Sequence, residues 1–277
     1  MAPRGEEWIE VRVADASNRD SVIAALFSAG SEGVQEIGNE IVTYFPSDID
    51  EARLRRAIAS ADSQAKITLR SAMFSLSGDV HGSVERQQIG ALTIAPPWLG
   101  DGLDLSSTII IEPAMAFGTG EHATTRGVLR LMQRISLDDK VVADLGSGSG
   151  ILAIAAAKLG ARKVIAIELD ADATSNATEN IGRNSVAERV HFIEGDASAI
   201  LPLVAPVDAV FANILSSVLV EMLPTIHDSL VEAGKAILSG ILVDERPAIL
   251  RAIRDSDWRV DDEDIEGEWW SVLISRV

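Results

Sequence analysis

Apolar residues recur at helix spacing and strand spacing in alternation from about residue 127 to the C-terminus. Strands are predicted at 141–145, 163–168, 189–193, 207–212, 235–239, 257–262 and 269–275, and helices at 151–159, 171–182, 216–232 and 244–255. The last two strands have no helix between them. Only an acidic run at 261–268 joins them, and we interpret that run as a solvated loop of an antiparallel hairpin. The pattern predicts an α/β domain whose mostly parallel, doubly wound sheet ends in one antiparallel strand.

The N-terminal part of the sequence predicts a different order of strands and helices. Strands are predicted at 8–13, 33–37, 40–45 and 66–70, with Gly38-Asn39 as a hairpin turn between the second and third. Helices are predicted from Asn18 or Asp20 to Ser28 and from Asp48 or Asp50 to about 59. The order β-α-β-β-α-β is that of the small α+β, ferredoxin-like plan. No catalytic constellation occurs in this part, so we interpret it as a recognition domain.

Glycine and proline mark the junction between the two parts. Residues 76–105 contain three isolated glycines, then Ala95-Pro-Pro-Trp98, and a β-branched strand follows at 107–111. We therefore predict a recognition domain at 1–76, a linker at 77–105 and a catalytic domain at 106–277.

The first strand of the catalytic domain runs into a glycine-rich turn, Val141-Val-Ala-Asp-Leu-Gly-Ser-Gly-Ser-Gly150. Glycines let a backbone approach a ligand closely, because no Cβ intervenes. The dinucleotide fingerprint would require glycine at position 151, where Ile151 stands. Gly-x-Gly-x-Gly after Asp144 instead resembles the first motif of methyltransferases that use S-adenosylmethionine. A glycine turn that binds no nucleoside stays an alternative.

Ligands of open α/β sheets bind beyond the carboxyl ends of the strands. On this rule Gly146 and Gly148 face the methionine part of the cofactor, and Glu168, which ends the second strand, accepts hydrogen bonds from ribose. Asp196 follows the third strand and either contacts adenine or is a turn residue. Asn213 ends the fourth strand, nearest the transferable methyl group. An amide in that apolar strand requires a polar partner, and a substrate amine is a plausible one.

A second glycine loop, Met115–Arg126, lies upstream of a helix predicted from Gly127 to Ile135. It could close over the cofactor and contribute the Thr124 and Thr125 hydroxyls, or it could be an ordinary N-cap. His122, a lone histidine beside the threonines, is interpreted as structural rather than as a base.

Composition narrows the function classes. A net charge of −18 argues against direct nucleic-acid binding, which requires a dense Lys/Arg surface, and suits a basic partner. The sequence has no cysteine, and its four histidines are scattered, so no metal site is expected. Neither an apolar leader nor a membrane-spanning segment is expected, and the expected location is cytoplasmic.

Three motifs in this order resemble the PrmA-type methyltransferases, which modify large-subunit ribosomal protein number eleven. They are Ala116–Thr125, Asp144–Ala155 and Ala212-Asn-Ile-Leu215, and the resemblance covers about residues 92–277. It implies a seven-stranded Rossmann-like class I methyltransferase domain after a ferredoxin-like domain that recognises the ribosomal protein. It also implies that Thr125, Gly146, Glu168 and Asn213 contact the cofactor.

The chain departs from that family pattern at several positions. Glu121 and Ala123 replace Thr and Pro in the first motif, and Glu168 stands where Asp is usual. The Trp- and Glu-rich segment that often precedes the linker is missing from Val80–Leu92, and the N-terminal domain matches in plan more than in residues.

The resulting hypothesis is an enzyme that transfers methyl groups from S-adenosylmethionine to lysine or N-terminal amines of a large-subunit ribosomal protein, with Asn213 as the catalytic residue. The first alternative is methylation of another protein or of a small amine. A nicotinamide-dependent oxidoreductase lacks support, because no hydride-transfer pair such as Tyr-x-x-x-Lys is found. A catalytically silent cofactor-binding module is the third alternative.

Overall fold

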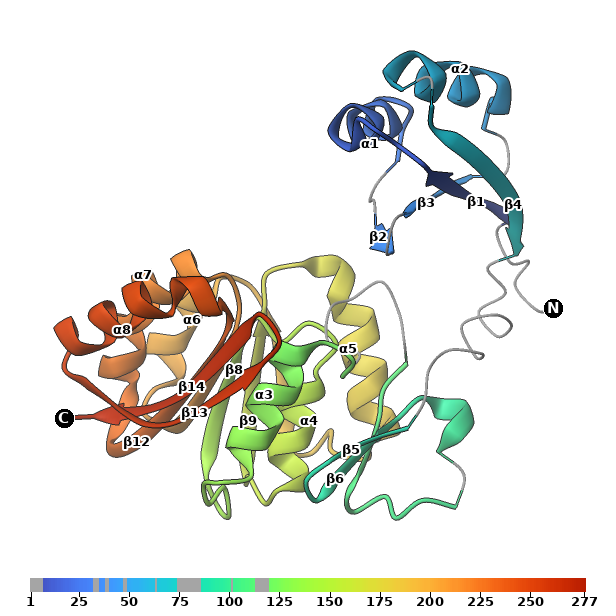
Figure 1. The fold of residues 1–277 in the computed structure, drawn as a ribbon. Coiled ribbons are helices and arrows are strands. Elements are labelled where there is room, and N and C mark those ends of the chain that lie inside the picture. The colour runs from blue at the N-terminus through green and yellow to red at the C-terminus, as the bar shows by residue number, and fades with distance from the viewer. Residues whose placement is uncertain are drawn as a thin grey trace. The chain divides into compact units, whose positions relative to one another are not determined.

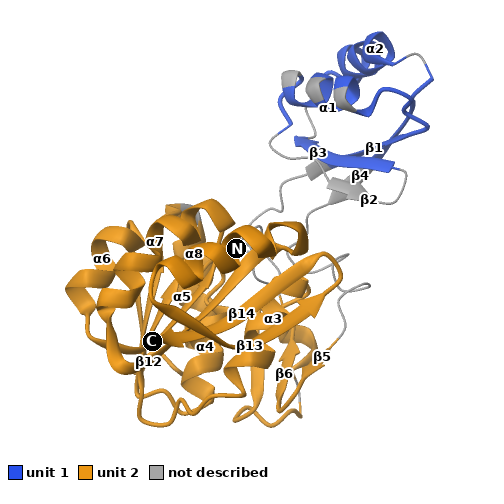
Figure 2. Cartoon of the chain, turned by 60° about the vertical axis from the view of Figure 1, so that its left-hand side comes forward, with its two compact units in different colours: residues 1–83 blue, residues 84–277 orange. Residues whose placement is uncertain are grey.

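A computed structural model describes residues 7–31, 35–37, 40–46, 49–62, 64–73, 86–100, 102–112 and 120–277. The chain divides into two compact units, Met1–Ser83 and Val84–Val277 (Figure 2). Each unit has its own hydrophobic core. The predicted Gly38-Asn39 turn, residues 77–85 of the predicted linker and residues 115–119 of the second glycine loop lie outside the described residues.

The first unit is a four-stranded antiparallel sheet with two helices. Its elements are β1 (Glu7–Ala14), α1 (Arg19–Ser28), β2 (Gln35–Ile37), β3 (Glu40–Pro46), α2 (Glu51–Ala61) and β4 (Lys66–Met73). Asn18 and Asp50 cap the helices, because their side chains accept from the backbone N–H of Ser21 at 3.2 Å and of Arg53 at 2.9 Å. The strand order β2-β3-β1-β4 confirms the ferredoxin-like plan.

Both helices cover one face of that sheet. Residues one helical turn apart on α1 (Val22, Leu26) and on α2 (Leu54, Ile58) form one buried cluster with strand residues such as Val11. The first unit therefore has its hydrophobic core between the two helices and one face of the sheet.

The second unit contains a seven-stranded sheet and a small three-stranded one. Its strands are β5 (Gln87–Ile89), β6 (Leu92–Ala95), β7 (Thr108–Ile110), β8 (Val141–Leu145), β9 (Lys163–Glu168), β10 (Val190–Glu194), β11 (Val207–Asn213), β12 (Leu230–Leu242), β13 (Trp258–Glu266) and β14 (Trp269–Arg276). Its helices are α3 (Ala123–Met132), α4 (Ile151–Lys158), α5 (Ala171–Arg183), α6 (Ala197–Val204), α7 (Ser216–Ser229) and α8 (Arg246–Asp255), with 3₁₀ turns η2 (Pro97–Leu99) and η3 (Val243–Glu245).

The large sheet has the order β10-β9-β8-β11-β12-β14-β13. Strands β8 to β12 are parallel to one another, and β14 is antiparallel to both β12 and β13. The predicted class I methyltransferase fold is confirmed in this respect. The antiparallel strand is not the edge, however, since β14 lies between β12 and β13.

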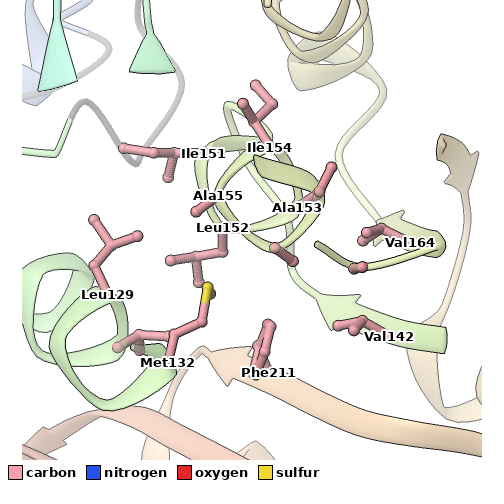
Figure 3. Close-up of a cluster of buried hydrophobic side chains, with 14 of the residues drawn as sticks. Leu129, Met132, Val142, Ile151, Leu152, Ala153, Ile154, Ala155, Val164 and Phe211 are labelled. Carbon is pink, nitrogen blue, oxygen red and sulfur yellow. The ribbon is translucent and has the colours of Figure 1, made fainter. Parts of the chain in front are cut away.

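Helices cover both faces of the large sheet (Figure 1). Helices α3, α4 and α5 share one buried cluster with the sheet, and α6, α7 and α8 share the other. Figure 3 shows part of the first cluster, where Leu129 and Met132 of α3 lie near Phe211 of β11 and the apolar residues of α4. Helix α4 (ILAIAAAK) is buried from Ile151 to Ala157, and its alanines let it pack closely on the strands.

Four local expectations differ from the structure. The acidic run 261–268 is largely strand β13 rather than a loop. Helix α6 is not predicted by the sequence pattern, because it is short and carries Pro202 inside it. Helix α3 begins at Ala123 rather than Gly127, so both threonines lie in its first turn. Residues 86–100 of the expected linker form β5, β6 and η2 within the second unit.

Candidate active site

The switch point of the large sheet lies at β8, because the chain continues to β9 on one side and to β11 on the other. Three predicted site features follow the carboxyl ends of these strands: the glycine turn after β8, Glu168 at the end of β9 and Asn213 at the end of β11. The structure thus brings them to one edge of the sheet.

The glycine turn adopts a backbone that other residues rarely adopt. Gly146, Gly148 and Gly150 have φ values of +69°, +49° and +81°. A Cβ at Gly146 would clash with Cγ2 of Ile214, directly beyond Asn213. The backbone N–H of Gly146 donates to the Ile167 carbonyl at 2.9 Å, which ties the turn to β9. The backbone path thus disfavours side chains at all three glycines and leaves no room for one at Gly146. We call residues 146–150 the glycine cradle.

Glu168 is directed at this cradle. Its Oε2 accepts from the backbone N–H of Gly148 at 2.8 Å, and its Oε1 accepts from that of Asp170 at 3.0 Å. Each carboxylate oxygen has a further lone pair, so the group can still accept from a ligand's hydroxyls.

Two buried side chains beside the cradle have unused hydrogen-bonding capacity. Neither carboxylate oxygen of Asp144, nor the Ser147 hydroxyl, has a hydrogen-bond partner among the described residues. Burial, reinforced by the charge of Glu168, raises the pKa of Asp144 to about 7. The Ala153 N–H opposes this rise in part, without a hydrogen bond of normal geometry. Buried polar atoms of this kind fit a polar ligand in the cradle.

Thr125 and Asn213 meet although they are far apart in the sequence. The Asn213 Nδ2 donates to Thr125 Oγ1 at 3.5 Å, and Thr125 is almost fully buried. Next to them, the Ser239 hydroxyl donates to the Thr124 carbonyl at 3.2 Å and shares a hydrogen bond with Ser271 at 2.7 Å. The first turn of α3 is therefore held against β11, β12 and β14.

His122 is the N-cap of α3. Its Nδ1 lies 2.7 Å from Thr124 Oγ1, and its ring makes an edge contact with Trp269 at a centroid distance of 4.9 Å. Burial, and then the charge of Arg126, lower the pKa of His122, which favours the neutral ring at neutral pH. These contacts give the histidine a structural role.

Asp196 is the N-cap of α6. Its Oδ1 accepts from the backbone N–H and from the hydroxyl of Ser198, both at 2.8 Å, and the hydroxyl first and then the N–H lower the pKa of Asp196. The preceding residue, Gly195, donates its N–H to the Glu168 carbonyl at 2.7 Å. Asp196 therefore lies on the segment beside Glu168, with its carboxylate exposed.

An ion-pair ladder joins α3 to β13. Three arginines at four-residue intervals, two on α3 and Arg134 just past its end, pair with alternate acids of the strand. The pairs are Arg126 with Glu266, Arg130 with Asp264 at 2.5 Å and Glu266 at 2.8 Å, and Arg134 with Asp262 at 2.7 Å. The ladder explains why an acidic run forms a strand here. It also fixes the helix that carries Thr125.

Two buried asparagines, Asn180 of α5 and Asn184 directly after its end, belong to the site's framework and are not predicted by the sequence analysis. Asn184 exchanges two hydrogen bonds with the backbone of Ile110, at 2.8 and 2.6 Å. Asn180 accepts from the Glu112 N–H at 3.1 Å and donates to the Ser149 carbonyl at 3.1 Å. They connect the glycine turn to the segment that enters the second glycine loop. Polar residues within an otherwise amphipathic helix are the signal that could have revealed them.

A pocket of about 650 Å³ lies away from this edge. It lies near the amino ends of β8, β11 and β12, and its lining includes Lys140 and Asp208, which pair with each other at 3.2 Å. Its charged groups stabilise the fold, and no predicted site residue lines it.

The described residues contain no helix that is long and apolar enough to cross a membrane. Within the same ranges, no group of three or more histidine or acidic side chains could hold a metal ion.

The chain is similar in sequence to known proteins. The profile of the family described as "Ribosomal protein L11 methyltransferase (PrmA)" matches residues 83–276. A ribosomal protein L11 methyltransferase of Thermus thermophilus is 32% identical over 264 residues, which cover 93% of this chain and 95% of that protein. One from Synechococcus is 38% identical, over 67% of this chain and 63% of its own length.

A solved structure is similar as well. The crystal structure of ribosomal protein L11 methylase from Lactobacillus delbrueckii subsp. bulgaricus matches with a TM-score of 0.63 and 31% identity, covering 70% of this chain and 99% of that chain. The match to the Synechococcus protein spans less than two thirds of that relative's length, whereas the match to the Thermus protein is nearly complete.

Proposed function

The chain belongs to the ribosomal protein L11 methyltransferase (PrmA) family, and on that premise we propose that it transfers methyl groups from S-adenosylmethionine to ribosomal protein L11. We propose further that the acceptors are lysine side chains or the N-terminal amine. The observation that carries the proposal is the Thr125–Asn213 hydrogen bond at the same sheet edge as the glycine cradle.

In this proposal the glycine cradle and the acidic residues beside it hold the cofactor. Gly146 and Gly148 admit its methionine part, Glu168 accepts from the ribose hydroxyls, and Asp196 accepts from the adenine amino group. The unpartnered oxygens of Asp144 support a polar ligand at this position. When bound, S-adenosylmethionine supplies a methyl group already activated by its sulfonium.

The residues of the chain then have to align a neutral amine. With Nδ2 of Asn213 donating to Thr125, its Oδ1 is the atom that accepts from the substrate amine and orients the nitrogen lone pair toward the methyl group. Thr125 holds the amide in that orientation, because the first turn of α3 is fixed by Ser239 and by the ion-pair ladder.

The amine must lose a proton before it attacks. A lysine amine in water has a pKa of about 10.4 and is mostly protonated at neutral pH. Desolvation in the site lowers that pKa, and solvent water accepts the proton. His122 is not required as a base in this proposal, because water takes the proton.

We propose that the ferredoxin-like domain, residues 1–76, recognises the ribosomal protein and that the domain from residue 106 carries the chemistry. The net charge of −18 supports a basic protein as the client. Because the proposed substrate is a ribosomal protein, we propose the cytoplasm as the site of action. Direct nucleic-acid binding is not part of the proposal.

Calorimetric titration of the purified chain with S-adenosylhomocysteine, NAD and NADP in parallel tests the proposal. We expect micromolar binding of S-adenosylhomocysteine alone. Binding of a nicotinamide nucleotide instead would overturn the assignment of the glycine turn and the mechanism built on it.

A further inference from the structure

An exposed apolar surface lies next to Asn213. Leu215, Val218 and Leu242 are 72%, 39% and 40% exposed. We call these three residues the apolar rim. Leu215 follows Asn213 by two residues, Val218 is one helical turn further on α7, and Leu242 ends β12. Exposed clusters of large apolar residues beside a site commonly mark a surface that a partner covers.

The segments that carry the rim are held together by specific contacts. The Glu245 carboxylate accepts from the Ser216 hydroxyl at 2.6 Å and from the Leu242 N–H at 2.9 Å. A Cβ at Gly240 would clash with the Ile214 carbonyl oxygen, so the two backbones are in close contact. The rim is therefore a formed surface of the catalytic unit.

The charged groups around the rim are acidic. Asp244 and Glu268 are exposed, and the Val243 N–H donates to the Glu268 carbonyl at 2.8 Å, which brings their segments together. Glu245 stays ionised, because the Ser216 hydroxyl and the Leu242 N–H lower its pKa. Glu266, two residues before Glu268, already has basic partners in α3.

We propose that the apolar rim and its acids Asp244, Glu245 and Glu268 bind the stretch of substrate polypeptide that surrounds the target amine. The occupant is a positively charged segment with an aliphatic residue beside the lysine or N-terminus that is methylated. The aliphatic contact anchors the segment beside Asn213, and the acids attract the basic segment. This inference rests on the proposed function, since it assumes a protein amine as acceptor.

Steady-state methylation of ribosomal protein L11 by the double variant Leu215→Ser/Leu242→Ser tests the rim. We expect KM for the protein substrate to rise roughly ten-fold or more, because apolar anchors dominate such contacts. The rate at saturating substrate and the affinity for S-adenosylhomocysteine should stay within about two-fold.

The matched control is Leu203→Ser. Leu203 is 82% exposed on α6, shortly before the amino end of β11 and thus at the opposite edge of the sheet. A second variant, Asp244→Asn/Glu268→Gln, should raise KM at low salt and lose that effect at high salt.

The outcomes separate the two proposals. An unchanged KM in the leucine double variant, or an equal rise in the Leu203 control, overturns the rim. Wild-type enzyme that binds S-adenosylhomocysteine but does not methylate the ribosomal protein overturns the substrate assignment on which the rim rests.

Discussion

The two sides of the switch point are built in different ways. On the β8–β9 side, the contact between Gly148 and Glu168 joins residues 20 positions apart, and backbone groups and one carboxylate form the cradle. On the β11–β14 side, Thr125 and Asn213 are 88 positions apart, and Arg126 and Glu266 are 140 apart. The β8–β9 side is formed by residues close together in the sequence, whereas the β11–β14 side forms only once the sheet is complete.

This difference assigns separate tasks to the two sides. Backbone cradles with positive φ angles suit the binding of an invariant ligand, because their shape is set mainly by the path of the backbone. A pair of side chains held by a helix, three strands and an ion-pair ladder suits the alignment of a reacting group. Changes on the β11–β14 side should thus affect turnover, and changes on the β8–β9 side should affect cofactor affinity.

Asn213→Ala should have the largest effect, and it tests the task assigned to the β11–β14 side. Loss of the orienting amide should lower turnover by roughly 10²–10³-fold, since a positioned polar group acts on the reacting atoms. Affinity for S-adenosylhomocysteine, measured by calorimetry, should change by only a few-fold. Near-wild-type turnover would remove Asn213 from the mechanism.

Burial of Asp144 should make the free energy of unfolding depend on pH. Its pKa in the folded protein, about 7, lies above the ordinary aspartate value of 3.8, so the native state holds a proton that the unfolded state loses between those values. Its contribution to stability is therefore fully present below about pH 4, declines as pH rises toward 7, and levels off above that pH. Urea unfolding of wild type and Asp144→Asn from pH 4 to 8 measures this.

We expect the wild-type free energy of unfolding to fall, relative to the Asn variant, by on the order of 3 kcal/mol over that range. Parallel curves for the two proteins would contradict the assignment of the buried proton to Asp144.

Glu168→Ala should weaken binding of S-adenosylhomocysteine by about 10- to 100-fold. The variant loses the acceptor for the Gly148 and Asp170 N–H groups as well as for the ribose, and each bond to a charged group is worth about 1.5–3 kcal/mol. Glu168→Asp is the matched control, because it keeps the carboxylate and should bind within several-fold of wild type. Equal affinity in the Ala variant would show that the cradle does not depend on this side chain.

The smallest expected effects are on stability, and they come from two ion pairs of the ladder. Asp264 is only 11% exposed in its pair with Arg130, whereas Arg134 and Asp262 are 45% and 39% exposed. After discounting for solvent screening, Arg130→Met should lower the free energy of unfolding by about 1–2 kcal/mol. Arg134→Met should cost about 0.5 kcal/mol or less. Denaturant unfolding of both variants measures the two losses of stability. Equal losses would mean that burial of the acid does not strengthen the ion pair.

Much of the β8–β9 side could be predicted from the sequence, because its signals are adjacent in the chain. The strand, the three glycines and the acidic residue that ends the next strand stand within about 30 residues of one another. The ferredoxin-like plan was predictable for the same reason, since each of its two helices is capped by the residue directly before it.

The β11–β14 side could not be predicted to the same extent. The sequence alone favours a loop for the acids of β13, because their arginine partners lie more than 120 positions earlier. It also places the start of α3 too late, because histidine is not among the preferred capping residues. Strands β5 and β6 are only three and four residues long, and they form because Ile89, Leu92 and Ile94 are buried in a core cluster of the second unit.

Intact-mass measurement of unmethylated ribosomal protein L11, incubated with S-adenosylmethionine and either wild-type enzyme or Asn213→Ala, tests the central claim most directly. The account predicts mass gains in whole methyl groups with the wild type, and roughly a hundred-fold or more slower gain with the variant, although both bind S-adenosylhomocysteine. No mass gain with a wild type that binds the cofactor, or equal rates for the two proteins, would contradict it.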